Sequence, residues 1–177
     1  MHSLVVGGTG MLAGVTTWLA QQGYTVSVVS RRAGRFSDEI PAGRIHAITV
    51  DYRESETLRQ RIDEAVSLHG PIQLAVFWIH TDARDAFRVI SEEVSRHASA
   101  PWRLFHVRGS AAHLNPEPPQ VPPNCRYREV VLGFVIEGNR SRWLTHEEIS
   151  GGVMDAIRKD GERTVVGTLE PWDKRPL

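Results

Sequence analysis

A strand, a glycine turn and a helix follow one another in the stretch Ser3-Leu-Val-Val-Gly-Gly-Thr-Gly-Met-Leu-Ala-Gly14. Its apolar, β-branched beginning is typical of a buried strand. The glycines that follow are typical of a tight turn. Beyond the turn, apolar residues recur at helical spacing, at Leu12, Val15 and Leu19. The stretch therefore predicts a strand that passes directly into a helix.

The composition of this turn is that of an anion-binding turn. Gly7 permits a sharp bend, and Gly10 leaves no side chain between the backbone and a bound pyrophosphate. Ala13 is small enough to let the helix lie close to the sheet. The free N–H groups and the positive dipole end of the new helix would then face the phosphates.

The same alternation of strands and helices continues to the end of the chain. We expect further strands at 24–29, 44–50, 72–79, 102–107, 130–136 and 164–168. Amphipathic helices are expected from near Glu54, from a cap at Thr81 or Asp82, and from Thr145. This order predicts an α/β, Rossmann-like, doubly wound parallel sheet of about seven strands, a three-layer αβα arrangement formed by residues 1–177 as a single domain.

Composition excludes several classes of protein. The 21 basic and 21 acidic residues balance, so no overall field attracts nucleic acid or a membrane surface. Cys125 is the only cysteine, which excludes an internal disulfide and agrees with a cytoplasmic location. The first strand begins at once, leaving no room for a signal peptide, and no apolar run is long enough to span a bilayer.

The glycine turn carries a family resemblance. The pattern Gly7-x-x-Gly10-x-x-Ala13, within Gly-Gly-Thr-Gly-Met-Leu-Ala, resembles the nucleotide-binding turn of the short-chain dehydrogenase/reductase superfamily, especially its extended and atypical branches. The resemblance implies a nicotinamide dinucleotide as cofactor. It implies that the pyrophosphate is held by Gly7, Gly8, Thr9, Gly10, Met11 and Leu12.

Two further strand ends match the superfamily in order. Ser30, Arg31 and Arg32 follow the second strand, where an acidic residue would bind a free ribose hydroxyl and arginine a 2′-phosphate. NADP(H) is therefore favoured over NAD(H), although two arginines in this place also suit a solvated loop. Asp51, beside Tyr52, matches the aspartate that binds the adenine amino group, and it could also cap the helix that follows.

The nicotinamide side departs from the superfamily pattern. Where the family has an asparagine-alanine-glycine stretch after the fourth strand, this chain has Trp78-Ile79-His80, which implies a remodelled pocket wall. The strand-end residues Phe77, Trp78 and Ile79 are expected to line the nicotinamide side. Ser110 follows the fifth strand and matches the catalytic serine that polarises a substrate carbonyl.

The usual catalytic Tyr-x-x-x-Lys is absent. The only lysines are Lys159 and Lys174, and Tyr127 is followed four places later by valine. Five prolines between Ser110 and Tyr127 forbid a regular helix. We therefore expect a proline-rich loop at 111–128 in place of the catalytic helix, and hence a truncated relative of the family.

Histidine is the candidate that remains for the missing proton donor. His80 and His113 lie near the same predicted edge as Ser110, and an imidazole can act as a general acid. With eight histidines in the chain, two near one edge can also be chance neighbours. The Cys/His spacing of a metal site is absent, and Cys125 lacks an activating neighbour in the sequence.

The C-terminal part predicts contacts beyond the sheet. Thr145 and Glu148 form a capping box, and the adjacent Gly151 and Gly152 predict close packing of the helix against another backbone, which could belong to a second copy. The family builds dimer or tetramer contacts here, so a homodimer or homotetramer is expected. Trp172, in the last segment, would cover the protein's own sheet or dock on a partner subunit.

Two functions are compatible with these features. The first is an NADP(H)-dependent oxidoreductase of the short-chain dehydrogenase type, which transfers a hydride to an unknown small carbonyl or enone substrate. The alternative is a catalytically inactive NADP(H)-binding redox sensor or regulatory protein. Ser110 favours the enzyme, and the missing tyrosine-lysine pair favours the sensor.

Overall fold

A computed structural model describes residues 1–7, 9–32 and 42–177 of the chain. Its main sheet has seven parallel strands in the order β3-β2-β1-β4-β5-β6-β9, as the sequence predicts. The strands are β1 (His2–Val6), β2 (Thr25–Ser30), β3 (Ile45–Thr49), β4 (Ile72–Phe77), β5 (Trp102–Arg108), β6 (Cys125–Leu132) and β9 (Arg163–Val166). A separate antiparallel hairpin is formed by β7 (Phe134–Glu137) and β8 (Arg140–Trp143).

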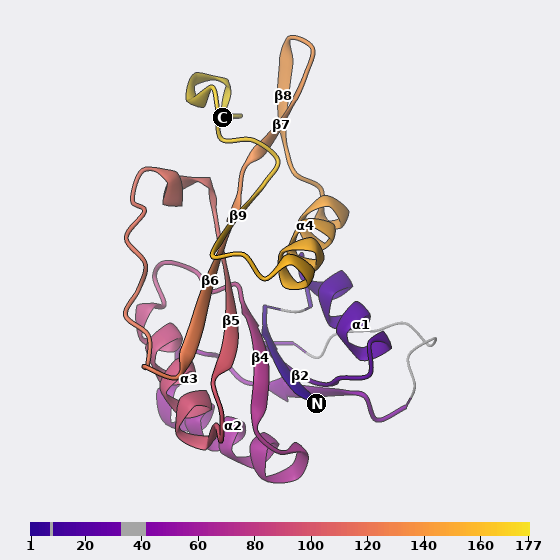
Figure 1. Cartoon of the computed structure of the whole chain (residues 1–177), viewed down its shortest axis with the longest axis vertical. Helices are drawn as coiled ribbons and strands as arrows, with labels where there is room; N and C mark the ends of the chain where they lie inside the picture. The colour runs from indigo at the N-terminus through magenta and orange to yellow at the C-terminus, as the bar shows by residue number, and fades with distance from the viewer. Residues whose placement is uncertain (8, 33–41) are drawn as a thin grey trace.

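Helices cover both faces of this sheet (Figure 1). The α-helices are α1 (Ala13–Gln21), α2 (Ser55–His69), α3 (Arg84–His97) and α4 (His146–Lys159). Two short 3-10 helices are η1 (Ser110–His113) and η2 (Trp172–Lys174). Successive strand residues point to opposite faces, so Leu4 and Val6 join the core beneath α2 and α3, whereas Val5 joins the core beneath α1 and α4. The predicted three-layer αβα arrangement is confirmed.

The strand order places a crevice at the end of β1. The chain leaves β1 for β2 and β3 on one side, then crosses to β4 on the other side. Ligands of open parallel sheets bind at the carboxyl ends of the strands where the order reverses in this way. The glycine turn after β1 lies at this reversal point.

Helix α4 is fixed at its start and along its length. The predicted capping box is present, because Glu148 N donates to Thr145 Oγ1 (3.1 Å) and Thr145 N donates to Glu148 Oε2 (2.8 Å). Arg142 of the hairpin donates to both oxygens of Glu148 at 2.9 Å, which together with the Thr145 bond lowers the pKa of Glu148 to about 2. The hairpin is thereby tied to the first turn of α4.

Small residues bring α4 against its neighbours. A Cβ on Gly14 of α1 would lie 2.9 Å from the Ser150 side chain, and Ser150 Oγ donates to Met11 O at 2.9 Å. A Cβ on Gly152 would lie 2.4 Å from a methyl group of Val166 in β9. The close neighbour of Gly152 is therefore a side chain of the chain's own sheet and not the backbone that we expected, and Gly151 has no neighbour within 4 Å of its Cβ position.

The run 130–136 is not one strand, contrary to our expectation. β6 ends at Leu132, and β7 begins a different sheet at Phe134. Phe134 and Thr168 exchange two backbone hydrogen bonds of 2.9 Å, and a Cβ on Gly133 would lie 2.1 Å from Thr168 O. This crossing turns the chain out of the sheet, so that the hairpin and the C-terminal segment lie beyond the strand ends (Figure 1).

Two further local expectations need correction. Neither Thr81 nor Asp82 caps α3, which begins after Ala83 without a side-chain cap, and Asp82 instead pairs with Arg53 at 2.8 Å. The proline-rich loop is shorter than 111–128, because η1 extends to His113 and β6 begins at Cys125. Residues 114–124 remain without helix or strand.

Within the described ranges of the chain, every helix is too short or too polar to cross a membrane.

The two adjacent glycines of α4 give a matched pair of variants for the packing of α4 on β9. Gly151→Ala places its Cβ in open space and should raise the free energy of unfolding by about 1 kcal/mol through helix propensity. Gly152→Ala must displace Val166 and should lower it by about 1–3 kcal/mol. Urea unfolding of both variants measures this difference, and equal effects would contradict the packing.

Candidate functional site

The turn after β1 requires glycine at its first position. Gly7 has φ +82°, and a Cβ there would lie 2.9 Å from the carbonyl oxygen of Trp78. Gly7 N donates to Val29 O at 3.1 Å, and Trp78 N donates to Val6 O at 3.0 Å. The turn is therefore held between the ends of β2 and β4.

The N-terminus of α1 is open to an anion. No side chain caps this helix, and its first turn has no acidic residue, whereas the first turns of the other three described α-helices each have one or more. Thr9 and Gly10 are exposed, and a Cβ on Gly10 would meet nothing within 4 Å. Leu12 is the buried residue that precedes the helix. Gly8 lies outside the described residues.

The arginines predicted for a phosphate contact lie at the same edge. Arg31 and Arg32 directly follow β2 and are exposed. The Ser30 hydroxyl donates to the carbonyl oxygen of Arg32, which shapes the turn. Among the described residues, no carboxylate forms an ion pair with either arginine.

Asp51 and Tyr52 lie at the end of β3. Asp51 Oδ1 accepts from the backbone N–H of Arg53 at 3.0 Å. Asp51 does not cap α2, whose N-cap residue is Glu54, without a side-chain hydrogen bond. The hydroxyl of Tyr52 accepts from His80 N at 3.4 Å, which connects this end to the segment after β4.

The three residues predicted to line the nicotinamide side differ in exposure. Phe77 is fully buried in the core, with its ring against Phe87 at 5.7 Å between centroids, and its side chain lines neither of the two cavities described below. Trp78 is half-buried and lies between two cavities, and Ile79 lines one of them.

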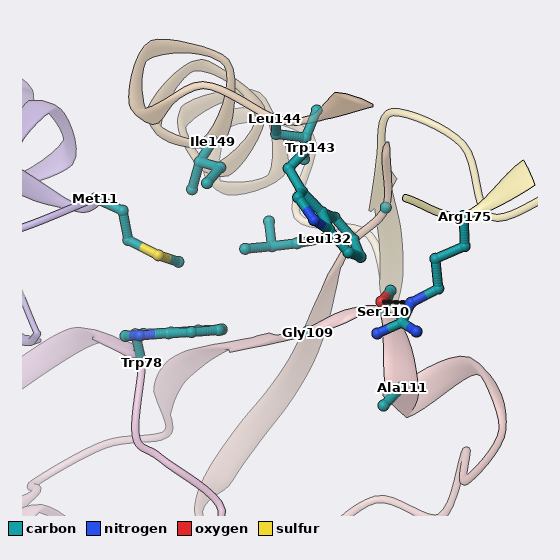
Figure 2. Close-up of a pocket in the computed structure, with 11 residues that line it drawn as sticks. Met11, Trp78, Gly109, Ser110, Ala111, Leu132, Trp143, Leu144, Ile149 and Arg175 are labelled. Atoms are coloured by element: carbon teal, nitrogen blue, oxygen red, sulfur yellow. Dashed lines mark hydrogen bonds between the residues drawn. The ribbon is translucent and has the colours of Figure 1, made fainter. Parts of the chain in front are cut away.

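The first cavity, of about 430 Å³, is an apolar slot over the carboxyl ends of β4, β5 and β6. Figure 2 shows Trp78 on one side of the slot, Trp143, Leu144 and Ile149 on the opposite side, Met11 near one end, and Ser110 with Arg175 at the other. Its lining residues are Met11, Trp78, Gly109, Ser110, Ala111, Leu132, Gly133, Trp143, Leu144, Ile149 and Arg175. Met11 of the glycine turn thus reaches the same cavity as Ser110.

Ser110 has a partner that the sequence analysis missed. Its buried Oγ accepts from Arg175 Nε at 3.0 Å, which leaves the hydroxyl hydrogen for another acceptor. The guanidinium of Arg175 lies over the rings of Trp143 (5.1 Å) and Trp172 (5.2 Å). A single arginine in a proline-containing tail carries no sequence signal for this position.

A second cavity, of about 700 Å³, lies between the start of α3 and the proline-rich segment. It is lined by His80 and His106 and by residues of the segment 115–119. The ring of His106 is hydrogen-bonded through Nδ1 to the hydroxyl of Tyr127 at 2.8 Å. Burial, with a smaller effect of nearby Arg108, lowers the pKa of His106 to about 3, and burial raises the pKa of Tyr127.

The three predicted catalytic residues are not brought together. Ser110 lines the first cavity, His80 lines the second, and His113 lines neither. His113 Nε2 lies 3.0 Å from Glu170 Oε1, with its ring 5.5 Å from that of Trp172. Trp172 itself packs against Ala112, Val131 and Leu169, so it covers its own sheet.

Two further candidate groups lie outside this site. Burial raises the pKa of the Cys125 thiol to about 12, which keeps it protonated and unreactive. Asp63, Glu93 and His97, on α2 and α3, could together hold a metal ion. Arg96 contacts both of these carboxylates and Arg59 also lies 3.8 Å from Glu93, so two arginines balance the two carboxylates without a metal.

Comparison with known proteins gives matches only among solved structures. No family model and no curated protein matches the chain. A short-chain dehydrogenase/reductase from Serratia marcescens BCRC 10948 is similar with a TM-score of 0.68 and 19% identity, over 94% of this chain and 95% of that one. A dehydrogenase/reductase from Sinorhizobium meliloti 1021 has the same TM-score and identity, over 94% and 93% of the two chains.

A 3-oxoacyl-[acyl-carrier protein] reductase from Brucella melitensis also has a TM-score of 0.68, with 12% identity over 96% of each chain. The chain therefore has the fold of these short-chain dehydrogenase/reductase structures, which confirms the Rossmann-like architecture.

The neutral imidazole of His106 predicts a loss of stability in acid. Because the pKa of His106 is lower in the folded state, the unfolded state binds more protons than the folded state below about pH 6.5. As the pH is lowered from there, the free energy of unfolding should decrease by up to about 1.4 kcal/mol per pH unit. Urea unfolding between pH 7.5 and 4.5 tests this. His106→Asn should make the profile less steep, whereas His146→Asn, at an exposed histidine, should leave it unchanged.

Proposed function

We propose that this chain is an atypical member of the short-chain dehydrogenase/reductase superfamily and an NADP(H)-dependent oxidoreductase. The observation that carries the proposal is the uncapped N-terminus of α1 together with Met11 of the glycine turn, which lines the same apolar cavity as Ser110. The likeness in fold to dehydrogenase and reductase structures supports it.

The residues of the turn fit a dinucleotide diphosphate. Thr9 and Gly10 are exposed, Gly10 leaves open space above the backbone, and the first turn of α1 has no competing acid. An anion placed here would receive backbone hydrogen bonds and the favourable end of the helix dipole. The turn Gly7–Leu12 would hold the diphosphate, including Gly8, which lies outside the described residues.

The adenosine half would extend towards the ends of β2 and β3. Arg31 and Arg32 are available to pair with a 2′-phosphate, with Ser30 shaping their turn, and this supports NADP(H) over NAD(H). Asp51 would accept from the adenine amino group through the oxygen that Arg53 N does not occupy, and Tyr52 would border the ring.

The reacting end would lie in the first cavity, beside Trp78 and Ser110, whereas Ile79 lines the second cavity. A bound reduced nicotinamide supplies a hydride to the carbon of a carbonyl or an activated double bond. Ser110 would donate its hydroxyl hydrogen to the substrate oxygen, because its Oγ already accepts from Arg175. His80 and His113 do not line this cavity, so we propose that water, and not histidine, delivers the proton that completes the alcohol.

We propose a cytoplasmic homodimer or homotetramer that uses α4 and β9. Among the described strands, β9 is an edge of the main sheet, and its Val165 is 38% exposed. Light scattering coupled to gel filtration measures the oligomeric state directly.

Cofactor titration followed by a substrate screen tests the proposed activity. NADPH should bind more tightly than NADH, and one or more small carbonyl or enone compounds should oxidise the bound NADPH. Ser110→Ala should lower kcat by about 10²-fold through loss of a donor to the developing oxyanion, with the Kd of NADPH unchanged. Binding of NADPH without turnover of any compound would favour an inactive sensor, and no binding would refute both functions.

The cofactor preference has its own test at β2. Arg31→Ala should weaken NADPH binding by about tenfold, because a charge-assisted contact to the 2′-phosphate is lost, and should leave NADH binding nearly unchanged. Arg140→Ala, at an exposed arginine of the hairpin, is the matched control and should affect neither. Equal losses for both dinucleotides in Arg31→Ala would exclude the phosphate contact.

A further inference from the structure

Arg175 is an exposed cation at one end of an apolar cavity. Its contacts are the Ser110 hydroxyl at 3.0 Å and the rings of Trp143 and Trp172. Within the part of the chain that the structure describes, no carboxylate forms an ion pair with it. Most other arginines described here, such as Arg142, do have such partners.

The rest of the cavity offers an anion no competing charge. None of its described lining residues is acidic, and Arg175 is the one that carries a full charge. The walls are provided by two indole rings, from Trp78 and Trp143, and by aliphatic side chains (Figure 2). Such a pocket favours a ligand with an apolar body and one anionic end.

The contact between Arg175 and Ser110 places two hydrogen-bond donors side by side, so a matching ligand needs two neighbouring acceptor groups. Nε–H of the guanidinium is directed at Ser110 Oγ, so the terminal N–H groups of Arg175 and the hydroxyl hydrogen of Ser110 remain free as neighbouring donors. A carboxylate matches the planar fork of a guanidinium. A carbonyl oxygen on the adjacent carbon would then lie beside the serine hydroxyl.

We propose that the cavity binds an α-keto acid with an apolar side chain. The carboxylate pairs with Arg175, the keto oxygen accepts from Ser110, and the apolar body lies between Trp78 and Trp143. Arg175 is a specificity-determining residue in this arrangement. Binding of the keto acid does not require the proposed oxidoreductase activity. Its reduction to a hydroxy acid rests on that proposed function.

In that step, hydride from the reduced nicotinamide forms a C–H bond at the keto carbon while the C=O π electrons move to oxygen. The oxygen takes a proton from water. The products are the α-hydroxy acid, the oxidised dinucleotide and hydroxide, which the buffer neutralises.

Calorimetric titration without dinucleotide tests the binding mode separately from the activity. The probes are phenylpyruvate, its amide and phenylacetone, which share the apolar body and the carbonyl and differ in the charged group. Phenylpyruvate should bind the wild-type chain at least about tenfold more tightly than either neutral probe. Arg175→Gln should remove this preference.

A matched control is available in the last turn of α4. Arg158 lies over the ring of Trp18 at 4.9 Å, as Arg175 lies over Trp143, but it does not line the cavity. Arg158→Gln should therefore retain the preference for phenylpyruvate. If Arg175→Gln does not fold, Arg175→Lys keeps the charge and should lower the preference several-fold, because an ammonium lacks the fork.

Equal binding of the three probes to the wild-type chain, no binding of phenylpyruvate, or a preference that persists in Arg175→Gln would each overturn the proposal. These results do not depend on hydride transfer. Oxidation of NADPH by neutral ketones alone would therefore support the oxidoreductase and overturn the keto-acid assignment. Preferential binding of phenylpyruvate without NADPH binding would support the keto-acid assignment and overturn the oxidoreductase.

Discussion

The backbone at Gly7 is the constraint on which the candidate site depends. With φ at +82° and the carbonyl oxygen of Trp78 2.9 Å from where a Cβ would lie, position 7 admits no side chain without moving β4 away from β1. The turn can therefore stay between the ends of β2 and β4, and α1 starts directly at the reversal point of the sheet. The N-terminus of α1 is uncapped because its N-cap residue is Leu12, and it is the feature to which we assign the diphosphate.

A second set of close contacts builds the other side of the cavity. The backbone bonds between Phe134 and Thr168, together with the approach at Gly133, carry the hairpin out of the sheet, and Arg142 then ties it to Glu148 of α4. As a result Trp143 lies across the slot from Trp78 (Figure 2). The C-terminal segment brings Arg175 to the end of the slot, where its guanidinium donates to Ser110 while the residue remains exposed to solvent.

Because the chain lacks the Tyr-x-x-x-Lys motif, the polar groups of the proposed enzyme differ from those that the family resemblance implies. Tyr127 is bonded to His106 under the proline-rich segment, and burial holds the pKa values of both groups away from neutrality, in opposite directions. Neither is therefore suited to exchange a proton near pH 7. The polar pair that remains in the first cavity is Ser110 and Arg175, which can donate hydrogen bonds but not act as a general acid at that pH.

The sequence by itself determined the seven-stranded parallel sheet, the glycine turn and the capping box of α4, because each rests on local periodicity, backbone freedom or hydrogen bonds between near neighbours. It also located the strand ends that carry Arg31, Asp51 and Ser110. Only the tertiary structure decided which of these side chains share a cavity. It separated His80 and His113 from Ser110 and brought Arg175 to it across 65 residues, since pairing between distant segments depends on how helices and loops pack and leaves no periodic trace in the chain.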